Sequence, residues 1–187
     1  MISKISPKVF DFLEARFMEL IGIILVFLSI FFLISLASYS PTDPNFLYPE
    51  KTDIKNLFGF PGSVISDFIL QSIGIIGFLL SLNILIWGIK IIISKDSNNI
   101  LKKIFFSLVY ILSGTATINI YKDHSFWLLD NGNGGFVGRI VSDFIFKYIN
   151  FLENNYITLS LSLITLVFFL ASINLKINHI AKFFKLI

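Results

Sequence analysis

The chain has 187 residues, 55% of them hydrophobic, with a mean hydropathy of +0.82 and a formal net charge of +3. This composition excludes an ordinary soluble domain, whose surface must be largely solvated, and predicts a membrane protein. Cysteine is absent, which excludes disulfides, thiolate metal sites and cysteine nucleophiles. His124 and His179 are isolated in the sequence, so no metal, cofactor or catalytic site is expected.

Residues 1–19 mix acids and bases with apolar residues at helical spacing, such as Phe10, Leu13 and Phe17. This pattern predicts a cytoplasmic juxtamembrane amphipathic helix that runs into the first membrane span. A cleaved signal peptide is not expected, because the acids are interleaved with the bases and the following apolar run is too long.

Four runs without a charged residue follow, at 20–42, 68–89, 104–121 and 154–175. At about 1.5 Å per residue in a helix, such runs can cross a hydrocarbon core of about 30 Å. They lack the period-2 alternation of β-barrel strands. We therefore expect an all-α membrane domain over residues 20–175 with four transmembrane helices.

A short sequence at residues 62–69 occurs again at residues 138–145. The copies share their Gly, Ser, Asp, Phe and Ile, exchange Val and Ile, and differ at Ser63 and Arg139. Such self-similarity indicates a duplicated unit, here two repeated hairpins with short interfacial helices in the outer loops. We expect the first copy to enter the second span directly and the second copy to lie flat until about Asn154.

One apolar face of each copy is expected to be buried against membrane or protein. The faces consist of Val64, Ile65, Phe68 and Ile69 and of Ile140, Val141, Phe144 and Ile145. Asp67 and Asp143 are expected to face headgroup water, where a carboxylate offsets the dipole at a helix start. Docking against the opposite hairpin or an outer partner is the alternative role for these two carboxylates.

Lysine and arginine predict the orientation, since they favour cytoplasmic loops. Ten of the 15 lie in the N-terminal segment, the 90–103 connection and the basic tail at 176–187. Both termini are therefore expected in the cytoplasm, with loops 40–66 and 122–153 outside. Aromatic residues fit interfacial belts: Tyr39, Tyr48, Tyr121, Trp127 and Tyr156 at the outer surface, and Trp87 at the inner one.

Small residues form stripes on the predicted spans: Gly74, Gly77, Ser81 and Gly88 on the second, and Ser107 and Gly114 on the third. They predict close helix packing, with contact between copies of the chain as a second role. Asn83 and Asn119 could form hydrogen bonds between helices. None of the four runs contains a charged residue of the kind that carriers place inside the membrane.

The loop residues resemble the N-terminal four-helix membrane domain of the FtsK/SpoIIIE DNA translocases. The resemblance rests on Ser-Tyr-Ser-Pro-Thr-Asp-Pro-Asn-Phe at 38–46, on Asn56, and on the glycine-containing segments before the second and fourth spans. Its motif residues are Ser40, Pro41, Asp43, Pro44, Gly59, Pro61, Gly62, Asp67, Gly134, Gly135, Gly138 and Asp143. The glycines at 131–138 lack the spacing of a dinucleotide-binding loop and predict a turn with positive φ.

The resemblance implies an inner-membrane anchor and oligomerisation module of a DNA translocase that acts in cell division and chromosome segregation at the septum. Its implied partners are membrane lipid, further copies of the chain and division-site membrane proteins, with DNA reached only through a motor domain. The sequence contains no Gly-x-x-x-x-Gly-Lys-Ser/Thr loop, so this chain is not expected to be an enzyme. We expect it to be a fragment or split product, with 176–187 as the start of a missing linker. The alternative is a small oligomeric transporter or channel subunit, which would need a polar path.

Overall fold

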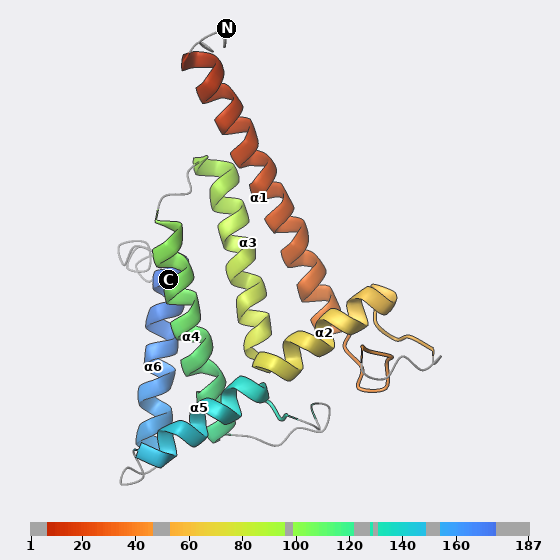
Figure 1. The fold of residues 1–187 in the computed structure, drawn as a ribbon, viewed down its shortest axis with the longest axis vertical. Coiled ribbons are helices and arrows are strands. Elements are labelled where there is room, and N and C mark those ends of the chain that lie inside the picture. The colour runs from red at the N-terminus through yellow and green to blue at the C-terminus, as the bar shows by residue number, and fades with distance from the viewer. Residues whose placement is uncertain are drawn as a thin grey trace, which may run out of the picture.

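A computed structural model describes residues 7–46, 53–95, 99–121, 128, 131–148 and 154–174 (Figure 1). All regular secondary structure in this part of the chain is helical. The helices are α1 (Pro7–Ala37), α2 (Gly59–Ile73), α3 (Ile76–Ser94), α4 (Ile100–Tyr121), α5 (Gly135–Tyr148) and α6 (Asn154–Ser172). Of these, α1, α3, α4 and α6 are long and apolar enough to cross a membrane. The prediction of an all-α fold with four spanning helices is confirmed.

The chain forms two units of the same design, a long helix, a short transverse helix and a second long helix (Figure 1). In the first unit α1 packs along α3, and in the second unit α4 packs along α6. The short helices α2 and α5 lie across the same end of the bundle and contact each other. The repeated sequence starts one turn into α2 and α5, so the duplication extends to the backbone.

The helix bounds differ from the predicted spans at two places. Helix α1 is continuous from Pro7 to Ala37, so the described part of the region 1–19 belongs to the same helix as the first span, which was predicted over 20–42. The prediction that the first copy runs directly into the second span is wrong, because α2 ends at Ile73 and Gly74 has a φ of 58°. A left-handed residue cannot continue an α-helix. The spanning helix starts at Ile76 and continues to Ser94, beyond the predicted end at residue 89, so it includes Lys90.

None of the eight side chains on the two apolar faces is fully buried within the chain, so of the two surfaces predicted to cover these faces, the membrane is the one that the described structure leaves. Phe68 and Phe144 are 72% and 63% exposed, and Ile140 is exposed as well. The buried positions are small instead: Gly62, Ser63 and Ser66 in α2, and Gly135, Gly138 and Ser142 in α5, with Leu70 as the one large side chain. Small side chains let transverse helices approach the bundle closely, while the apolar ones point outward to where lipid would lie.

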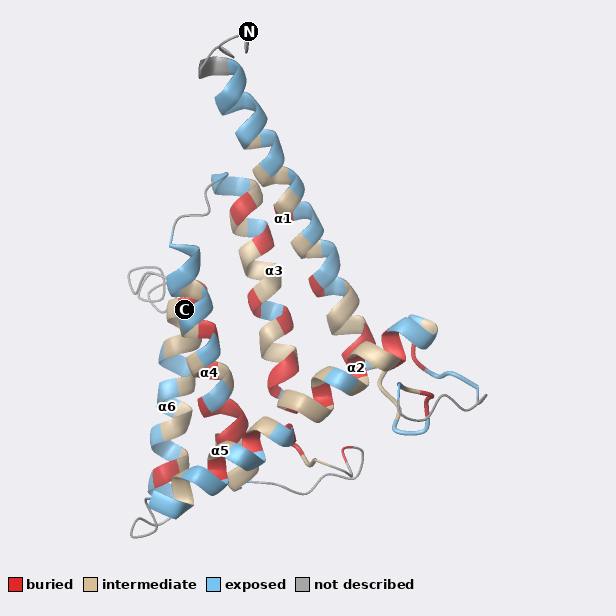
Figure 2. Ribbon diagram, in the orientation of Figure 1, coloured by how far each residue is buried: buried red, intermediate tan, exposed pale blue. Residues whose placement is uncertain are grey.

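The interior is rich in small polar residues, and much of the apolar surface faces outward (Figure 2). Leu36, Leu70 and Leu128 form a buried apolar cluster where α1 meets α2. Phe10, Phe17 and many other large apolar side chains on the outside of α1 are exposed. An exposed apolar surface of this extent requires lipid or another protein to cover it.

Candidate functional site

The loop after α1 folds around the carboxylate of Asp43, which is buried. Its Oδ1 accepts a hydrogen bond from the backbone N–H of Lys55 at 3.0 Å, and its Oδ2 accepts one from Asn56 at 2.8 Å. The N–H of Asp43 donates to the carbonyl of Ser40, which closes a turn around Pro41. One carboxylate thus holds the two sides of the outer loop together, because bonds to an ionised acceptor are stronger than neutral ones.

Asn56 connects this loop to α1 and α2. Its Nδ2 donates to the carbonyl of Ser35 at 2.8 Å and lies 3.4 Å from the Oγ of Ser66, while its Oδ1 accepts from the N–H of Phe58. A Cβ at Gly62 would lie 2.1 Å from this Oδ1. Glycine at position 62 is therefore needed for the amide of Asn56 to fit between the two helices.

Asp67 and Asp143 occupy different environments despite their equivalent sequence positions. Asp67 is half-buried and accepts hydrogen bonds from the Tyr39 hydroxyl at 3.1 Å and from Asn45 Nδ2 at 3.0 Å. Asp143 is exposed on α5. The expectation that both carboxylates face headgroup water is wrong for Asp67, and the partners named here belong to its own unit rather than to the opposite hairpin.

The family-motif residues between 40 and 67 lie in or beside this loop, and further serine contacts join it to α2. The Oγ of Ser63 donates to the carbonyl of Pro44 at 2.5 Å, and the Oγ of Ser40 lies 2.9 Å from that of Thr42. Gly59 starts α2 with a φ of +61°, and Pro61 lies exposed in the first turn, where its missing N–H is no loss. We call residues 38–46 and 53–67 the outer cap.

The second group of motif residues forms a joint between the two units. The N–H of Ile75 donates to the carbonyl of Asn133 at 3.0 Å. A Cβ at Gly74 would lie 1.9 Å from that carbonyl oxygen, and a Cβ at Gly135 would lie 2.6 Å from the backbone nitrogen of Gly74. Gly74 and Gly135 also have positive φ values, so both space and conformation require glycine.

Gly134 and Gly138 seat α5 on α4. A Cβ on either glycine would lie within 2.7 Å of the Thr115 carbonyl oxygen. The Nδ2 of Asn119 donates to the Oγ of Ser142 at 2.8 Å on the same contact. Asn119 therefore joins a spanning helix to a transverse helix, as the sequence pattern suggested for asparagines in this protein.

The small residues of the predicted second span face α1, with the exception of Gly74. A Cβ at Gly77 would lie 2.5 Å from Ile69 of α2 and 3.7 Å from Leu36 of α1. The carbonyl of Ser81 accepts from the Oγ of Ser29 at 2.7 Å, and Gly88 meets Gly22. A Cβ at Gly22 would lie 2.8 Å from the Gly88 carbonyl oxygen. Sequence reasoning missed Gly22, although Gly22 and Ser29 share one helical face of α1. Gly114 of α4 packs between Ile76 of α3 and Thr165 of α6.

A buried polar cluster links α3, α4 and α6. The Nδ2 of Asn83 lies 2.6 Å from the Oγ of Ser172, 3.1 Å from the Tyr110 hydroxyl and 3.3 Å from the Oγ of Ser107. One and two turns further along α3, Trp87 donates to the carbonyl of Ser172 and Lys90 donates to that of Ile173. The sequence singled out Asn83 but gave no sign of its partners, because they come from other helices.

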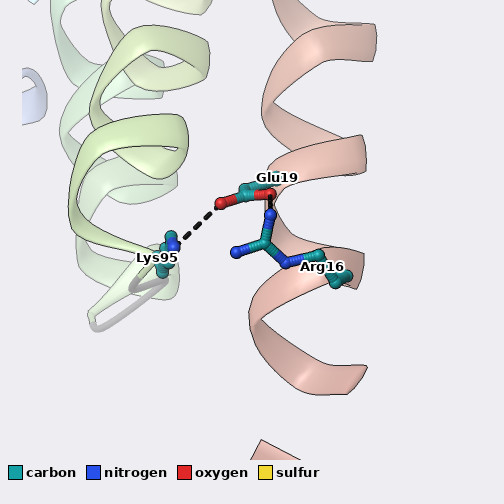
Figure 3. Close-up of polar contacts among 3 residues, drawn as sticks. All are labelled: Arg16, Glu19 and Lys95. Atoms are coloured by element: carbon teal, nitrogen blue, oxygen red, sulfur yellow. Dashed lines mark ion pairs between the residues drawn. The ribbon is translucent and has the colours of Figure 1, made fainter. Parts of the chain in front are cut away.

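An ion-pair group joins the N-terminal half of α1 to the end of α3 (Figure 3). Glu19 lies 2.5 Å from Arg16 and 2.9 Å from Lys95, the residue that follows α3. Among the described residues, no group of three His, Asp or Glu side chains could hold a metal ion. The described polar contacts join helices to one another, as in a scaffold.

Comparison with known proteins supplies the family. Residues 14–181 match the 4TM region of DNA translocase FtsK/SpoIIIE. The DNA translocase FtsK of Agrobacterium fabrum is 25% identical over 133 residues, which cover 71% of this chain and 15% of the relative. That of Rickettsia typhi is 29% identical over 150 residues, covering 80% of this chain and 20% of the relative. That of Azospirillum brasilense is 34% identical over 93 residues, covering 49% and 15%.

No solved structure matches this chain. The chain spans about a fifth or less of the length of these curated relatives. The match covers α1 to α6, including the outer cap, the joint between the units and the four spanning helices. The chain therefore belongs to the FtsK/SpoIIIE family of DNA translocases, within its four-helix membrane region.

Proposed function

We propose that this chain is the inner-membrane anchor and oligomerisation module of a septal DNA translocase, with both termini in the cytoplasm. The observation that carries the proposal is the family match, which falls on the membrane region and spans all six helices. The relatives are named DNA translocases, and a motor that handles DNA needs a fixed point on the cytoplasmic face of the membrane. Cell division and chromosome partition are the processes that such an anchor would serve.

The arrangement of the helix ends supports an anchor. Glu19 of α1 pairs with Lys95 after α3, and Lys90 of α3 donates to the carbonyls of Ile173 and Asn174 after α6. The N-terminal half of α1, the end of α3 and the end of α6 therefore lie at the same end of the bundle. Lys90, Lys95, Lys102 and Lys103 lie at this end, and the lysine and arginine bias favours the cytoplasm for it.

The exposed apolar side of α1 supports contact between copies. Phe17 and Phe27 are 61% and 69% exposed, and they belong to a row of large apolar residues along this helix. Exposed apolar surface of this extent needs lipid or another protein to cover it, and neighbouring copies that pack here would cover part of the row. The stripe of Gly77, Ser81 and Gly88 is used within the chain, so it offers less to a second copy.

A small oligomeric transporter or channel subunit is the second candidate. It would need a polar path through the spans. The buried Asn83 lies among the side chains of Ser107, Tyr110 and Ser172, and Lys90 donates to backbone carbonyls at the end of α6. These groups bond to one another across the helices, which favours a scaffold.

The test is a chimera in Agrobacterium fabrum, in which this chain replaces the membrane region of the bacterium's own DNA translocase. We expect a fluorescent fusion to gather at the septum and chromosome segregation to proceed. The control carries four unrelated spanning helices of the same topology, which should anchor the motor without gathering it. Photobleaching steps in the septal spots should report several copies per spot. A diffuse, single-copy signal from the chimera would overturn the septal and oligomeric parts of the proposal.

A further inference from the structure

A groove of about 360 Å³ lies between α1, α3 and α4, at the end of the bundle that carries the lysines. Its walls are apolar and include Leu25 of α1, Ile91 of α3 and Ile173 beyond α6. Trp87 also lines it, with its indole N–H engaged by the carbonyl of Ser172. The polar cluster around Asn83 and the contacts of the outer cap do not account for this space.

Two lysines border the groove from different helices. Lys90 lies about one turn before the end of α3, and Lys103 lies in the first turn of α4. No acidic side chain of the described residues forms an ion pair with either of them, whereas nearby Lys95 is paired with Glu19. Lys90 gives hydrogen bonds to two carbonyls, and these leave its positive charge unneutralised.

The groove combines apolar walls with two cations at its rim, so a matching ligand has an apolar part and an anionic part. A long apolar chain fits the walls, and a phosphate fits the lysines. Basic pockets between spanning helices recognise anionic lipid headgroups in this manner. We propose that the groove binds one anionic glycerophospholipid, with an acyl chain along Leu25, Ile91 and Ile173 and the headgroup phosphate between Lys90 and Lys103.

Placement of the lysines suits this ligand better than a soluble anion. Lys90 and Lys103 sit within the helices that cross the membrane, near their ends, where headgroups lie. Lys103 is half-buried in the groove, and the neighbouring Lys102 is exposed on the same turn of α4. The proposal depends on the four-span arrangement alone and not on the DNA translocase role.

The chain provides its own reporter, because it contains only two tryptophans and Trp87 lines the groove. In a Trp127→Phe background, Trp87 fluorescence is measured in phosphatidylcholine vesicles that contain either phosphatidylglycerol or phosphatidylcholine with brominated acyl chains. We expect brominated phosphatidylglycerol to quench Trp87 with an apparent affinity at least about fivefold higher than that of brominated phosphatidylcholine. The reason is that one lysine contributes about 1 kcal/mol to the attraction of an anionic lipid.

Lys103→Gln should bring the two lipids close to equal quenching, while the matched control Lys102→Gln should keep the difference. Ile21→Phe, which narrows the groove without changing charge, should weaken quenching by phosphatidylglycerol. Inorganic phosphate at matched ionic strength should not displace the lipid.

Three other results would contradict the proposal. Equal losses of the lipid preference in the two lysine variants would indicate a diffuse electrostatic attraction at the surface. Competition by inorganic phosphate would indicate a site for free anions. No lipid preference would indicate that protein fills the groove. Each of these results would overturn the proposal.

Discussion

Ser66 and Ser142 occupy the same position in the two copies and make the same set of contacts. Each hydroxyl donates to the carbonyl three residues earlier, that of Ser63 or of Arg139. Each also lies within hydrogen-bond reach of an asparagine Nδ2, from Asn56 in the first unit and Asn119 in the second. The repeat is therefore one of contacts as well as sequence, and it places an asparagine and a serine between a long helix and a transverse helix twice.

Gly59 and Gly135 allow the joint between the two units to be tested at equivalent positions. Both have positive φ, but a Cβ at Gly59 meets nothing within 4 Å, whereas one at Gly135 meets the backbone of Gly74 and Ser72. Gly59→Ala should cost about 1 kcal/mol from conformation alone. Gly135→Ala should cost about 2 kcal/mol more from overpacking, measured by thermal unfolding in mild detergent. Equal losses would show that the units do not depend on this contact.

Asp67 and Asp143 form a second matched pair. Asp67→Asn should lower the free energy of unfolding by about 2 kcal/mol, because it removes charge from an acceptor of the Tyr39 and Asn45 hydrogen bonds. Asp143→Asn, on an exposed carboxylate, should stay within about 0.5 kcal/mol. Tyr39→Phe in the Asp67→Asn background should add less than it does alone. Similar losses at both aspartates would contradict the different environments.

The number of spans, the outer turns and the duplication could be predicted from the sequence. Uncharged length identifies spanning helices, and the predicted run 104–121 agrees with α4 to within a turn. The division of the second run could not be predicted, because residues on both sides of Gly74 are apolar and hydropathy does not report φ. Spacing identified the apolar face of each copy, but in a membrane such a face can point outward to lipid.

The contacts between distant helices were also beyond the sequence. Asn83 stands out as an amide in an apolar run, but Ser172 and Tyr110 look like ordinary helix residues until the fold brings them together. The same holds for Gly22, because glycine is required there by the close approach of Gly88 on another helix. The local sequence pattern indicates which face of a helix is unusual, but the residues that contact this face are known only from the three-dimensional structure.

Gly22 gives a test of the contact between α1 and α3. Gly22→Leu should lower the free energy of unfolding by about 3 kcal/mol, because the new side chain meets the backbone of Gly88 and Ile92. Ile23→Leu on the exposed side is the control. Gly77→Leu should cost less, since its nearest neighbour is the movable side chain of Ile69. If Gly22→Leu behaves like the control, α1 does not pack on α3 through this face.

Orientation is open to a direct test, since the chain has no cysteine of its own. Single-cysteine variants Phe46→Cys and Ser94→Cys place a thiol at exposed positions on opposite ends of the bundle. A membrane-impermeant maleimide should label the cysteine at position 46 in intact spheroplasts, and the one at position 94 only after lysis. The reverse pattern would place both termini outside and refute the orientation predicted from lysine and arginine.

The polar cluster at Asn83 should stabilise the protein mainly through the hydrogen bond between Asn83 and Ser172. The Nδ2 of Asn83 and the Oγ of Ser172 are 2.6 Å apart, and both residues are buried. Hydrogen bonds between membrane helices average about 0.6 kcal/mol and reach about 1.7 kcal/mol. A double-mutant cycle of Asn83→Ala and Ser172→Ala, measured by unfolding in detergent mixtures, should give a coupling energy of about 1 kcal/mol. The same cycle of Asn83→Ala with Ser160→Ala, a serine that bonds only within α6 among the described contacts, should give none. A coupling of zero for the first pair would mean that α3 and α6 are held together by Trp87 and Lys90 instead.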